Sequence, residues 1–331
     1  MNFLRIEPAL PEELASEFTE FWEETFETPY DGFQNMLDGD ESTDNQDIIY
    51  VMRQGEQLVG TCHLTISRAS PQLGGLGEVA TAPEFRRQGI GSLLCEYAHN
   101  DFRRHGGEAL FLGTVNPGAA RVYHRLGWRK LAGATVMALI VQGDSPEAFL
   151  VDYFRKSVAV TITDGGSAMR IPMIPLLVCP HDWQVLDANV AMFSTRYTVQ
   201  SSCMGLYPRY ESLGRDKASA WFGMHGGQER LVGLATARLD ASGACQVDGF
   251  THGRFLDAWA DLMQAAMQWG ATAGATKWSA TVSIEDEDKR ARFELLGFGA
   301  AGAGEEFTLA GRPVPSLQLE RSVGNVNAGG N

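Results

Sequence analysis

The feature that most constrains the fold is a repeat within the chain. The stretch YHRLGW at residues 123–128 returns as FELLGF at residues 293–298, each with an aromatic residue at both ends and Leu-Gly before the second one. The same order of predicted elements leads to each copy: a strand-turn-strand pair, a third strand, a helix, a strand and a short helix. A period near half the chain predicts an internal duplication, and therefore two domains of one fold.

The length of 331 residues also favours two domains. The predicted boundaries are residues 1–142 for the first domain, 143–169 for a connecting helix and linker, 170–321 for the second domain and 322–331 for a disordered tail. Two local expectations belong to this division. TDGGSA at residues 163–168 is predicted to be a turn or linker, and residues 182–193 are predicted to form a helix.

Composition is that of an ordinary globular protein, with 44% hydrophobic and 21% charged residues. The first residues lack the basic and apolar regions of a signal peptide, and no apolar run reaches the roughly 18 residues of a membrane helix. The five cysteines are scattered without a CxxC pair, which favours buried thiols in a reducing compartment. We expect a cytoplasmic protein with no metal and no membrane partner, either a monomer or a homodimer.

The negative charge is concentrated near the N-terminus. Of a net charge of −14, residues 1–50 account for nearly all, with fourteen Asp and Glu against one basic residue, Arg5. Because nucleic-acid binding needs a basic face, this distribution argues against nucleic acid as a partner. A cationic partner near the first fifty residues fits the charge better.

A strand, a short loop and a helix predict an anion site between residues 76 and 92. The strand is LGEVATA, the loop is PEFRRQ and the helix opens at GIGS. Free N–H groups and the positive end of the helix dipole meet at such a helix start. Gly89 and Gly91 leave these nitrogens accessible, and Arg86 and Arg87 flank them. We expect a phosphate or pyrophosphate there; close packing of a helix on a sheet is the alternative use of such glycines.

The spacing RxxGxG (Arg86, Gly89, Gly91), followed by NPGAARVYHRLGW from residue 116, resembles the GNAT superfamily of N-acetyltransferases. Both motifs stand in the family's order, and the resemblance spans about residues 40–140. It implies an α/β (α+β) fold of two GNAT-like domains, each with a mixed, mostly antiparallel sheet flanked by helices. It also implies acetyl-CoA as the cosubstrate. A Rossmann fold is not indicated, because the glycines of the loop lie mid-domain and the neighbouring strands are predicted to form hairpins.

The resemblance implies a role for each residue of the two motifs. The strand before the loop would pair with the pantetheine arm, and one of its N–H groups would stabilise the oxyanion of a tetrahedral intermediate. The loop would hold the pyrophosphate, and Asn116, also a good helix N-cap, would contact the cofactor near its thioester or pantetheine. The implied cofactor-binding residues are Val79, Ala80, Thr81, Arg86, Arg87, Gln88, Gly89, Ile90, Gly91, Ser92 and Asn116.

Tyr123 stands where this family carries the general acid that protonates the departing CoA thiolate. The alternative is a core aromatic residue at helical spacing with Val122 and Leu126. The second copy has Phe293 at the equivalent place, so packing alone accepts a ring without a hydroxyl. That comparison favours a separate role for the Tyr123 oxygen.

An attacking amine must lose a proton, so a base or a water chain is needed. Glu78 is the first candidate, because relatives of this type carry an acidic residue there that faces the acceptor; an exposed strand residue is the alternative. His63 and His124 are weaker candidates, since a lone histidine is more often a surface or core residue.

The acidic N-terminal region leads to a hypothesis about the acceptor. In this superfamily the first helices form part of the acceptor wall. The acidic residues there are Glu23, Glu24, Glu27, Asp31, Asp38 and Asp40, interleaved with the aromatic residues Trp22, Phe26, Tyr30 and Phe33. A cationic amine would be attracted by this field and packed against the rings. The alternative is a solvated helix face that keeps the chain soluble.

The second copy lacks the anion loop. Only THGR stands between its strand CQVDGF and the helix at Phe255, with no RxxGxG. We expect a degenerate GNAT-like domain that does not bind acetyl-CoA in the usual way. Its expected role is structural: covering the sheet edge of the first domain and closing one wall of the acceptor cleft.

The sequence therefore predicts an acetyl-CoA-dependent N-acyltransferase that transfers an acetyl group to the amine of a small molecule in a ternary complex. Two alternatives stay open. The first is a non-catalytic acyl-CoA-binding sensor or assembly module, which would not need the hydroxyl of Tyr123. The second is an aminoacyl-transferase that uses charged tRNA, against which the negative charge and the intact pyrophosphate loop count.

Overall fold

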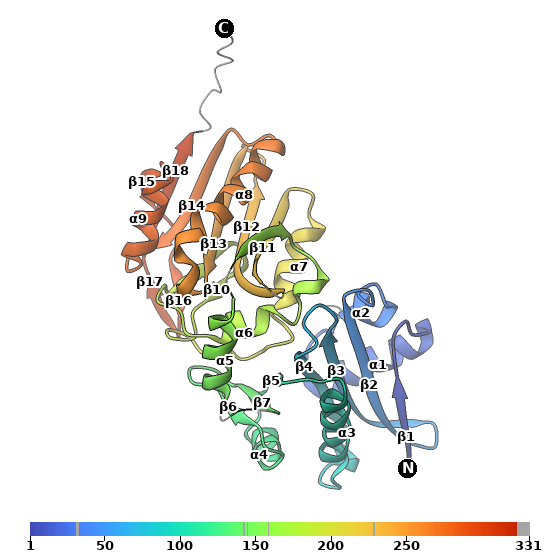
Figure 1. Ribbon diagram of the computed structural model, residues 1–331. Coiled ribbons are helices and arrows are strands. Elements are labelled where there is room, and N and C mark those ends of the chain that lie inside the picture. Colours follow the sequence, from blue (N-terminus) through green and yellow to red (C-terminus); the bar gives the residue numbers. More distant parts are fainter. Residues whose placement is uncertain (31–32, 142, 144, 158, 228, 323–331) are drawn as a thin grey trace. The chain divides into compact units, whose positions relative to one another are not determined.

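A computed structural model describes residues 1–322 except 31–32, 142, 144, 158 and 228. The chain divides into two compact units, each assembled from three stretches of sequence. The first unit comprises Met1–Arg155, Gly166–Val178 and Gln200–Pro208, and the second comprises Lys156–Gly165, Cys179–Val199 and Arg209–Asn331. Figure 1 labels the elements of both units.

The first unit is built around one sheet (Figure 1). Its strands among the described residues are β1 (Asn2–Ile6), β2 (Asn45–Gln54), β3 (Gln57–Ser67), β4 (Leu73–Thr81), β5 (Ala109–Gly113), β6 (Arg129–Lys130) and β7 (Val136–Ile140). They lie in the order β1-β2-β3-β4-β5-β7-β6, and every neighbouring pair is antiparallel except β4 and β5. The hairpin between β2 and β3 turns at Gly55 with φ +60°, at the Gly-Glu pair that predicts it.

Helices cover both faces of this sheet. They are α1 (Glu12–Phe26), α2 (Gln34–Asp38), α3 (Ile90–Arg104), α4 (Pro117–Arg125), α5 (Pro146–Arg155) and α6 (Met173–Val178). Helix α3 packs on β2, β3 and β4 through a core that includes Leu94, Ala98 and Phe102. Helices α1 and α2 pack on the opposite face through a second core with Phe18 and Trp22. The four-residue spacing of apolar side chains along α1 produces this buried face.

The second unit repeats this sheet. Its strands among the described residues are β8 (Val160–Asp164), β11 (Ser219–Gly226), β12 (Arg230–Leu239), β13 (Ala244–Thr251), β14 (Lys277–Ser283), β15 (Gly299–Ala303) and β18 (Ser316–Ser322). Read from β8, their order is β8-β11-β12-β13-β14-β18-β15, and β13 and β14 are the parallel pair. Each strand has a counterpart at the same place in the first sheet, as the repeat in the sequence predicts.

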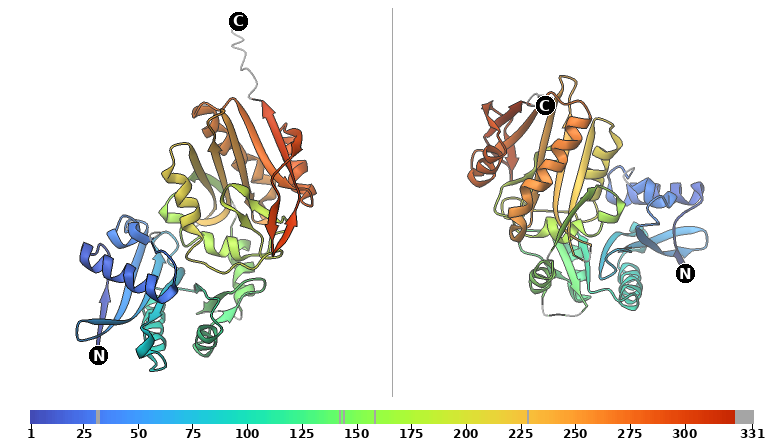
Figure 2. Two further views of the ribbon diagram at one scale, coloured as in Figure 1. Left: turned by 180° about the vertical axis from the view of Figure 1, so that it is seen from behind. Right: turned by 45° about the horizontal axis from the view of Figure 1, so that its top comes forward.

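The remaining elements include two helices of the second unit that correspond to helices of the first. They are α7 (Tyr207–Arg215), α8 (Trp259–Thr272), α9 (Glu287–Leu295), β9 (Val185–Asp187), β10 (Met192–Phe193), β16 (Phe307–Leu309), β17 (Arg312–Val314) and the 3-10 helices η2 (Pro83–Phe85), η3 (Ser167–Met169), η4 (Ala188–Val190) and η5 (Gly253–Ala258). Figure 2 shows α8 lying across β11, β12 and β13. It follows β13 as α3 follows β4, and α9 follows β14 as α4 follows β5. The predicted α/β (α+β) class with two mostly antiparallel sheets is confirmed.

The compact units differ from the domain boundaries expected from the sequence. Residues 170–178 and 200–208 belong to the first unit, although they fall in the stretch expected to form the second domain. The stretch expected to be a linker contains β8, which pairs with β11 and includes the first two residues of TDGGSA, and η3, which includes its last two. Of the expected tail at 322–331, all but the first residue lies outside the described residues.

Glycines on β4 and β5 explain how the later segments fit into the first unit. A Cβ on Gly75 would lie 2.4 Å from Sδ of Met204, and a Cβ on Gly113 would lie 2.8 Å from Cα of Ser202. Non-bonded carbon and sulfur atoms do not approach this closely, so these strands need glycine to admit residues 200–208. Nothing in the local sequence reveals such a contact between distant segments.

Residues 182–193 form no α-helix, so the helix predicted there is wrong. Side chains of distant elements bind its backbone instead: Asp286 accepts a hydrogen bond from the N–H of Gln184 at 2.7 Å, and Asp248 accepts one from the N–H of Ala188 at 2.7 Å. These tertiary contacts override the apolar periodicity of the segment.

Residues 184–189 of this stretch contact both β13 and the start of α9. Strand β13 pairs with β14 only at Ala244–Gln246. Beyond that point Lys289, fully buried on α9, contacts Oδ1 of Asp248 at 2.6 Å and donates to the carbonyl of Val185 at 2.8 Å. The second unit's own residues 184–189 are therefore bonded to both elements where β13 and β14 stop pairing.

Replacing Lys289 tests whether this contact holds the second unit together. Lys289→Met leaves the buried Asp248 without its cation, and we expect the free energy of unfolding to fall by about 3 kcal/mol or more. Lys277→Met is the control, because Lys277 forms a half-exposed pair with Glu320; its expected cost is about 1 kcal/mol or less. Urea unfolding of the full chain measures both. Equal losses of unfolding free energy in the two variants would contradict this role of Lys289.

Candidate active site

Strand β4 carries a bulge opposite Cys62 on β3. Thr61 lies opposite Ala80 and His63 lies opposite Gly77, so two residues of β4, Glu78 and Val79, face one residue of β3. Glu78 has φ +47°, in the left-handed region. A bulge of this kind interrupts the ladder and re-aims a side chain. Here the side chain concerned is the carboxylate of Glu78.

Strand β4 also leaves its other neighbour near this point. It pairs with β5 only through residues 73–75, whereas β4 itself continues to Thr81. Along Leu76–Thr81 no strand pairs on the β5 side within the part of the chain that the structure describes. An edge of this kind can accept an added strand. Val79, Ala80 and Thr81, the residues predicted to pair with the pantetheine arm, lie along this edge.

The loop after β4 delivers the chain into α3 in the form that an anion site requires. Arg87 and Gly89 are both left-handed, with φ +64° and +83°. Gly89 is the N-cap of α3, and no side chain caps the first N–H groups of this 15-residue helix. Free N–H groups at a helix start, together with the helix dipole, favour an anion. The predicted loop residues Arg87, Gln88 and Ser92 surround this point, while Ile90 is buried beneath it.

Close packing explains neither Gly89 nor Gly91 in this loop. A Cβ on Gly89 would meet nothing within 4 Å, and its positive φ alone accounts for glycine there. A Cβ on Gly91 would lie 3.6 Å from Oγ1 of Thr81, an ordinary van der Waals contact. Close packing of the helix on the sheet therefore does not require Gly91. The side chain of Arg86 is held by a hydrogen bond, because its Nε donates to the carbonyl of Thr81 at 3.1 Å.

Helix α4 positions Asn116 and Tyr123. Asn116 caps the helix, with Oδ1 accepting from the N–H of Gly118 at 2.8 Å and from the N–H of Ala119 at 3.3 Å. Tyr123 packs 6.2 Å from the ring of Trp128 and is 7% exposed. Burial raises the pKa of Tyr123 well above its ordinary value, and the charge of Glu78 adds to the effect. The phenol therefore stays protonated at neutral pH, as a proton donor must.

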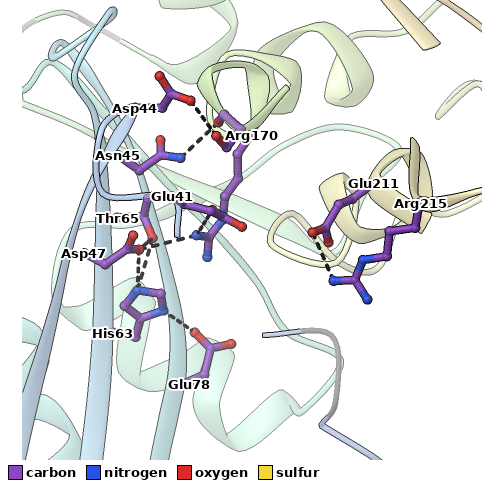
Figure 3. Close-up of polar contacts among 11 residues, drawn as sticks. Glu41, Asp44, Asn45, Asp47, His63, Thr65, Glu78, Arg170, Glu211 and Arg215 are labelled. Atoms are coloured by element: carbon purple, nitrogen blue, oxygen red, sulfur yellow. Dashed lines mark hydrogen bonds and ion pairs between the residues drawn. The ribbon is translucent and has the colours of Figure 1, made fainter. Parts of the chain in front are cut away.

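His63 lies between two carboxylates in the interior of the first unit (Figure 3). Its Nδ1 is 2.7 Å from Oε2 of Glu78, and its Nε2 is 2.7 Å from Oδ1 of Asp47. Burial by itself lowers the pKa of His63, but the hydrogen bonds and charges of the two carboxylates outweigh it and raise the pKa to about 9. His63, named from the sequence as a weaker base candidate, is thus joined to Glu78, whereas His124 is exposed on α4.

Arg170 continues this line of contacts (Figure 3). Its Nη1 donates to Oε2 of Glu41 at 2.7 Å and lies 3.5 Å from Oδ1 of Asp47, which also accepts from Oγ1 of Thr65 at 2.6 Å. Burial acts to raise the pKa of Asp47, but the charge of Arg170 and the bonds from His63 leave it lowered. Asp47 is therefore ionised at neutral pH.

The sequence alone did not indicate Asp47 or Arg170 as residues of this site. A signal was available for Asp47, because polar residues at alternate positions interrupt the apolar runs of β2 and β3 and so share one buried face. Arg170 has no such signal, since it reaches the site from a segment far along the chain.

Aromatic rings gather around the other side of Glu78. The hydroxyl of Tyr30 donates to Oε1 of Glu78 at 3.0 Å. The ring of Tyr30 lies 5.6 Å from Phe26, 5.2 Å from Phe33 and 5.4 Å from Trp22. These four residues, called the aromatic cluster below, are the ones expected to line the acceptor wall. The acidic residues expected with them are exposed at Glu23, Glu24, Glu27, Asp38 and Asp40, and Asp31 lies outside the described residues.

Residues 8–128, which contain the bulge, the loop and the catalytic candidates, match the family model described as Acetyltransferase (GNAT) family. The first unit contains a GNAT acetyltransferase domain. No curated protein matched the chain. The described part of the second unit has neither the bulge nor the loop, because β12 and β13 pair without a register shift and η5 follows β13 in place of the glycine loop.

Solved structures of acetyltransferases resemble part of the chain. A chimera of the spermidine N-acetyltransferase SpeG from Vibrio cholerae with hSSAT is 16% identical, with 50% of this chain and 96% of that chain covered and a TM-score of 0.41. The acetyltransferase of the GNAT family from Streptococcus pneumoniae is 10% identical, with 50% and 100% covered and a TM-score of 0.39.

Other expectations concern thiols, metals and membranes. All five cysteines are free and buried, as predicted. Among the described residues, no group of three or more His, Cys, Asp or Glu side chains is placed to hold a metal ion. Every helix in the described part of the chain is too short or too polar to span a bilayer.

The acetyltransferase domain should lose stability as pH rises through the titration of His63. Because the pKa of His63 is about 9 in the folded chain and 6.5 ordinarily, its contribution is complete below about pH 6.5 and lost by about pH 9. The expected loss is on the order of 3 kcal/mol. Urea unfolding across this range measures it. His63→Gln should remove this pH dependence of the unfolding free energy, and His124→Gln should keep it. The wild-type pH dependence in His63→Gln would show that His63 is not the group that causes it.

Proposed function

We propose that the chain is an acetyl-CoA-dependent N-acyltransferase, which transfers an acetyl group to the amine of a small molecule by direct attack in a ternary complex. One observation carries this proposal: the end of β4, which bulges at Glu78 and has no described strand on its β5 side, leads through a short loop to the uncapped start of α3. The match of residues 8–128 to the acetyltransferase family supports it.

In the proposed complex the cofactor follows this path of backbone. Its pantetheine arm pairs with Val79–Thr81 along the edge that β5 leaves open. Its pyrophosphate binds the N–H groups of Gly89, Ile90, Gly91 and Ser92 at the start of α3, with Arg87, Gln88 and the remaining donors of Arg86 around it. The amide of the N-cap Asn116 keeps its NH₂ donors for the cofactor, because only its Oδ1 bonds the helix.

The proposed chemistry uses one acid and one base. The amine nitrogen attacks the thioester carbonyl carbon, and the resulting oxyanion is stabilised by a backbone N–H at the bulge. Glu78 takes the proton that the amine must lose. As the carbon–sulfur bond breaks, the hydroxyl of Tyr123 donates its proton to the CoA thiolate. The raised pKa of Tyr123 keeps this proton in place until then.

The proposed acceptor is a cationic amine. The aromatic cluster includes Tyr30, whose hydroxyl donates to Oε1 of Glu78. A ligand packed on the rings of this cluster would therefore lie next to the proposed base. Ring faces attract cations, and the exposed carboxylates of α1 add a negative field.

The second unit is proposed to be a degenerate copy without an acetyl-CoA site. Three observations support this: β13 has no bulge, no glycine loop precedes α8, and the chain's own residues 184–189 are bonded to both β13 and α9. The place of an added strand is thus taken by the protein itself.

Tyr123→Phe tests catalysis against binding alone. We expect thiol release from acetyl-CoA to fall about 10²- to 10⁴-fold, with the dissociation constant of acetyl-CoA unchanged. Stability should be nearly unchanged, because Phe293 fills the corresponding place in the second unit and is fully buried. The same change Tyr→Phe at Tyr197, an exposed residue of the second unit, is the control. Unchanged turnover in Tyr123→Phe would leave an acyl-CoA-binding sensor as the better proposal.

Salt tests the proposed acceptor class. With a polyamine as acceptor, we expect KM to rise between about 0.05 M and about 0.5 M salt, because screening weakens attraction between exposed charges. Replacing Glu23, Glu24 and Glu27 together by Gln should reduce this dependence and leave the KM of acetyl-CoA unchanged. A flat salt dependence in the wild type would remove electrostatic attraction from the proposal.

A further inference from the structure

The carboxylate of Glu78 is held from two sides. The interior side is His63, whose Nδ1 contacts Oε2 at 2.7 Å, and the other side is the Tyr30 hydroxyl, which donates to Oε1 at 3.0 Å. Both contacts come from elements other than β4, so the direction of this side chain is set by β3 and by the segment after α1.

The geometry at His63 also fixes its protonation. Each of its ring nitrogens lies 2.7 Å from a carboxylate oxygen, one of Glu78 and one of Asp47. A ring nitrogen without a proton is an acceptor and would face an acceptor, so both nitrogens must carry protons when both carboxylates are ionised. His63 is then an imidazolium with no free nitrogen.

Arg170 supplies the second cation of the group. Five side chains meet here, and none is more than 8% exposed: Glu41, Asp47, His63, Glu78 and Arg170. Without Arg170, one cation would face three buried carboxylates, and buried charges without partners are strongly unfavourable. Arg170 thus allows Asp47 to stay ionised next to His63.

The segment that carries Arg170 is fixed to the start of β2. The side-chain amide of Asn45 donates to the carbonyl of Ser167 at 2.9 Å, and the hydroxyl of Ser167 donates to Asp44. Residues 166–178 belong to the first unit, yet they lie outside the family match at 8–128.

We infer that Asp47, His63 and Arg170 are positioning residues that fix the carboxylate of Glu78 for the acceptor, and that residues 166–178 are thereby part of the active site. This inference rests on the proposed role of Glu78 as the base. Because both nitrogens of His63 already hold protons, His63 does not accept the proton of the amine. That proton leaves Glu78 on the side of Oε1 and Tyr30.

Asp47→Asn and Glu41→Gln form a matched pair that tests the inference. Each replaces a buried carboxylate beside Nη1 of Arg170 by an amide of the same shape, but only Asp47 contacts His63. We expect Asp47→Asn to lower kcat by about 10- to 100-fold with an unchanged KM for acetyl-CoA, and Glu41→Gln to leave kcat within about threefold. Equal loss in both variants, or no loss in Asp47→Asn, would overturn the inference.

The ¹⁵N NMR signals of the His63 ring give a readout that does not depend on activity. In the full-length wild type at neutral pH, both ring nitrogens should be protonated; in Asp47→Asn the ring should be neutral, with one proton. A neutral ring in the wild type would overturn the inference even if both variants lose activity.

Glu78→Gln separates failure of the inference from failure of the proposed function. Wild-type turnover in Glu78→Gln would refute the proposed base and the inference together. Loss of turnover in Glu78→Gln, with no difference between Asp47→Asn and Glu41→Gln, would refute the inference alone.

Discussion

One extra residue on β4 organises the acetyltransferase domain. Because Glu78 and Val79 together face a single residue of β3, the ladder is interrupted and Glu78 adopts a left-handed backbone. Its carboxylate then reaches His63 on one side and Tyr30 on the other. Beyond the bulge no described strand pairs with β4 on the β5 side, and the chain passes through the loop of residues 82–88 to the start of α3. The proposed base, the proposed cofactor edge and the anion site therefore all depend on the course of one strand.

The two units show how one scaffold can be used in two ways. Their sheets share strand order, pairing sense and helix placement, and in both the parallel pair stops after three residues. In the first unit the open edge lies beside an uncapped helix and buried polar side chains. In the second unit the edge lies beside residues 184–189, held by Asp248 and Lys289. A shared fold thus does not imply a shared function.

The sequence predicts the parts of this structure that depend on local pattern. Apolar periodicity, the Gly-Glu turn and the Asn116 cap place the strands and helices of the first unit, and the repeated aromatic motif predicts the second. Contacts between distant segments were not predictable. Residues 182–193 have a helical pattern but are held by Asp248 and Asp286, and Arg170 reaches Asp47 across more than a hundred residues. Such pairs obey burial and charge, which leave no local signature.

The most direct test of the account is hydrogen–deuterium exchange of the full chain with and without acetyl-CoA, resolved to individual peptides. Acetyl-CoA bound to the first unit should slow exchange at residues 79–81 and at 89–92 and leave exchange at 247–256 in the second unit unchanged. Protection confined to the second unit, or no protection at either stretch of the first, would contradict this expectation.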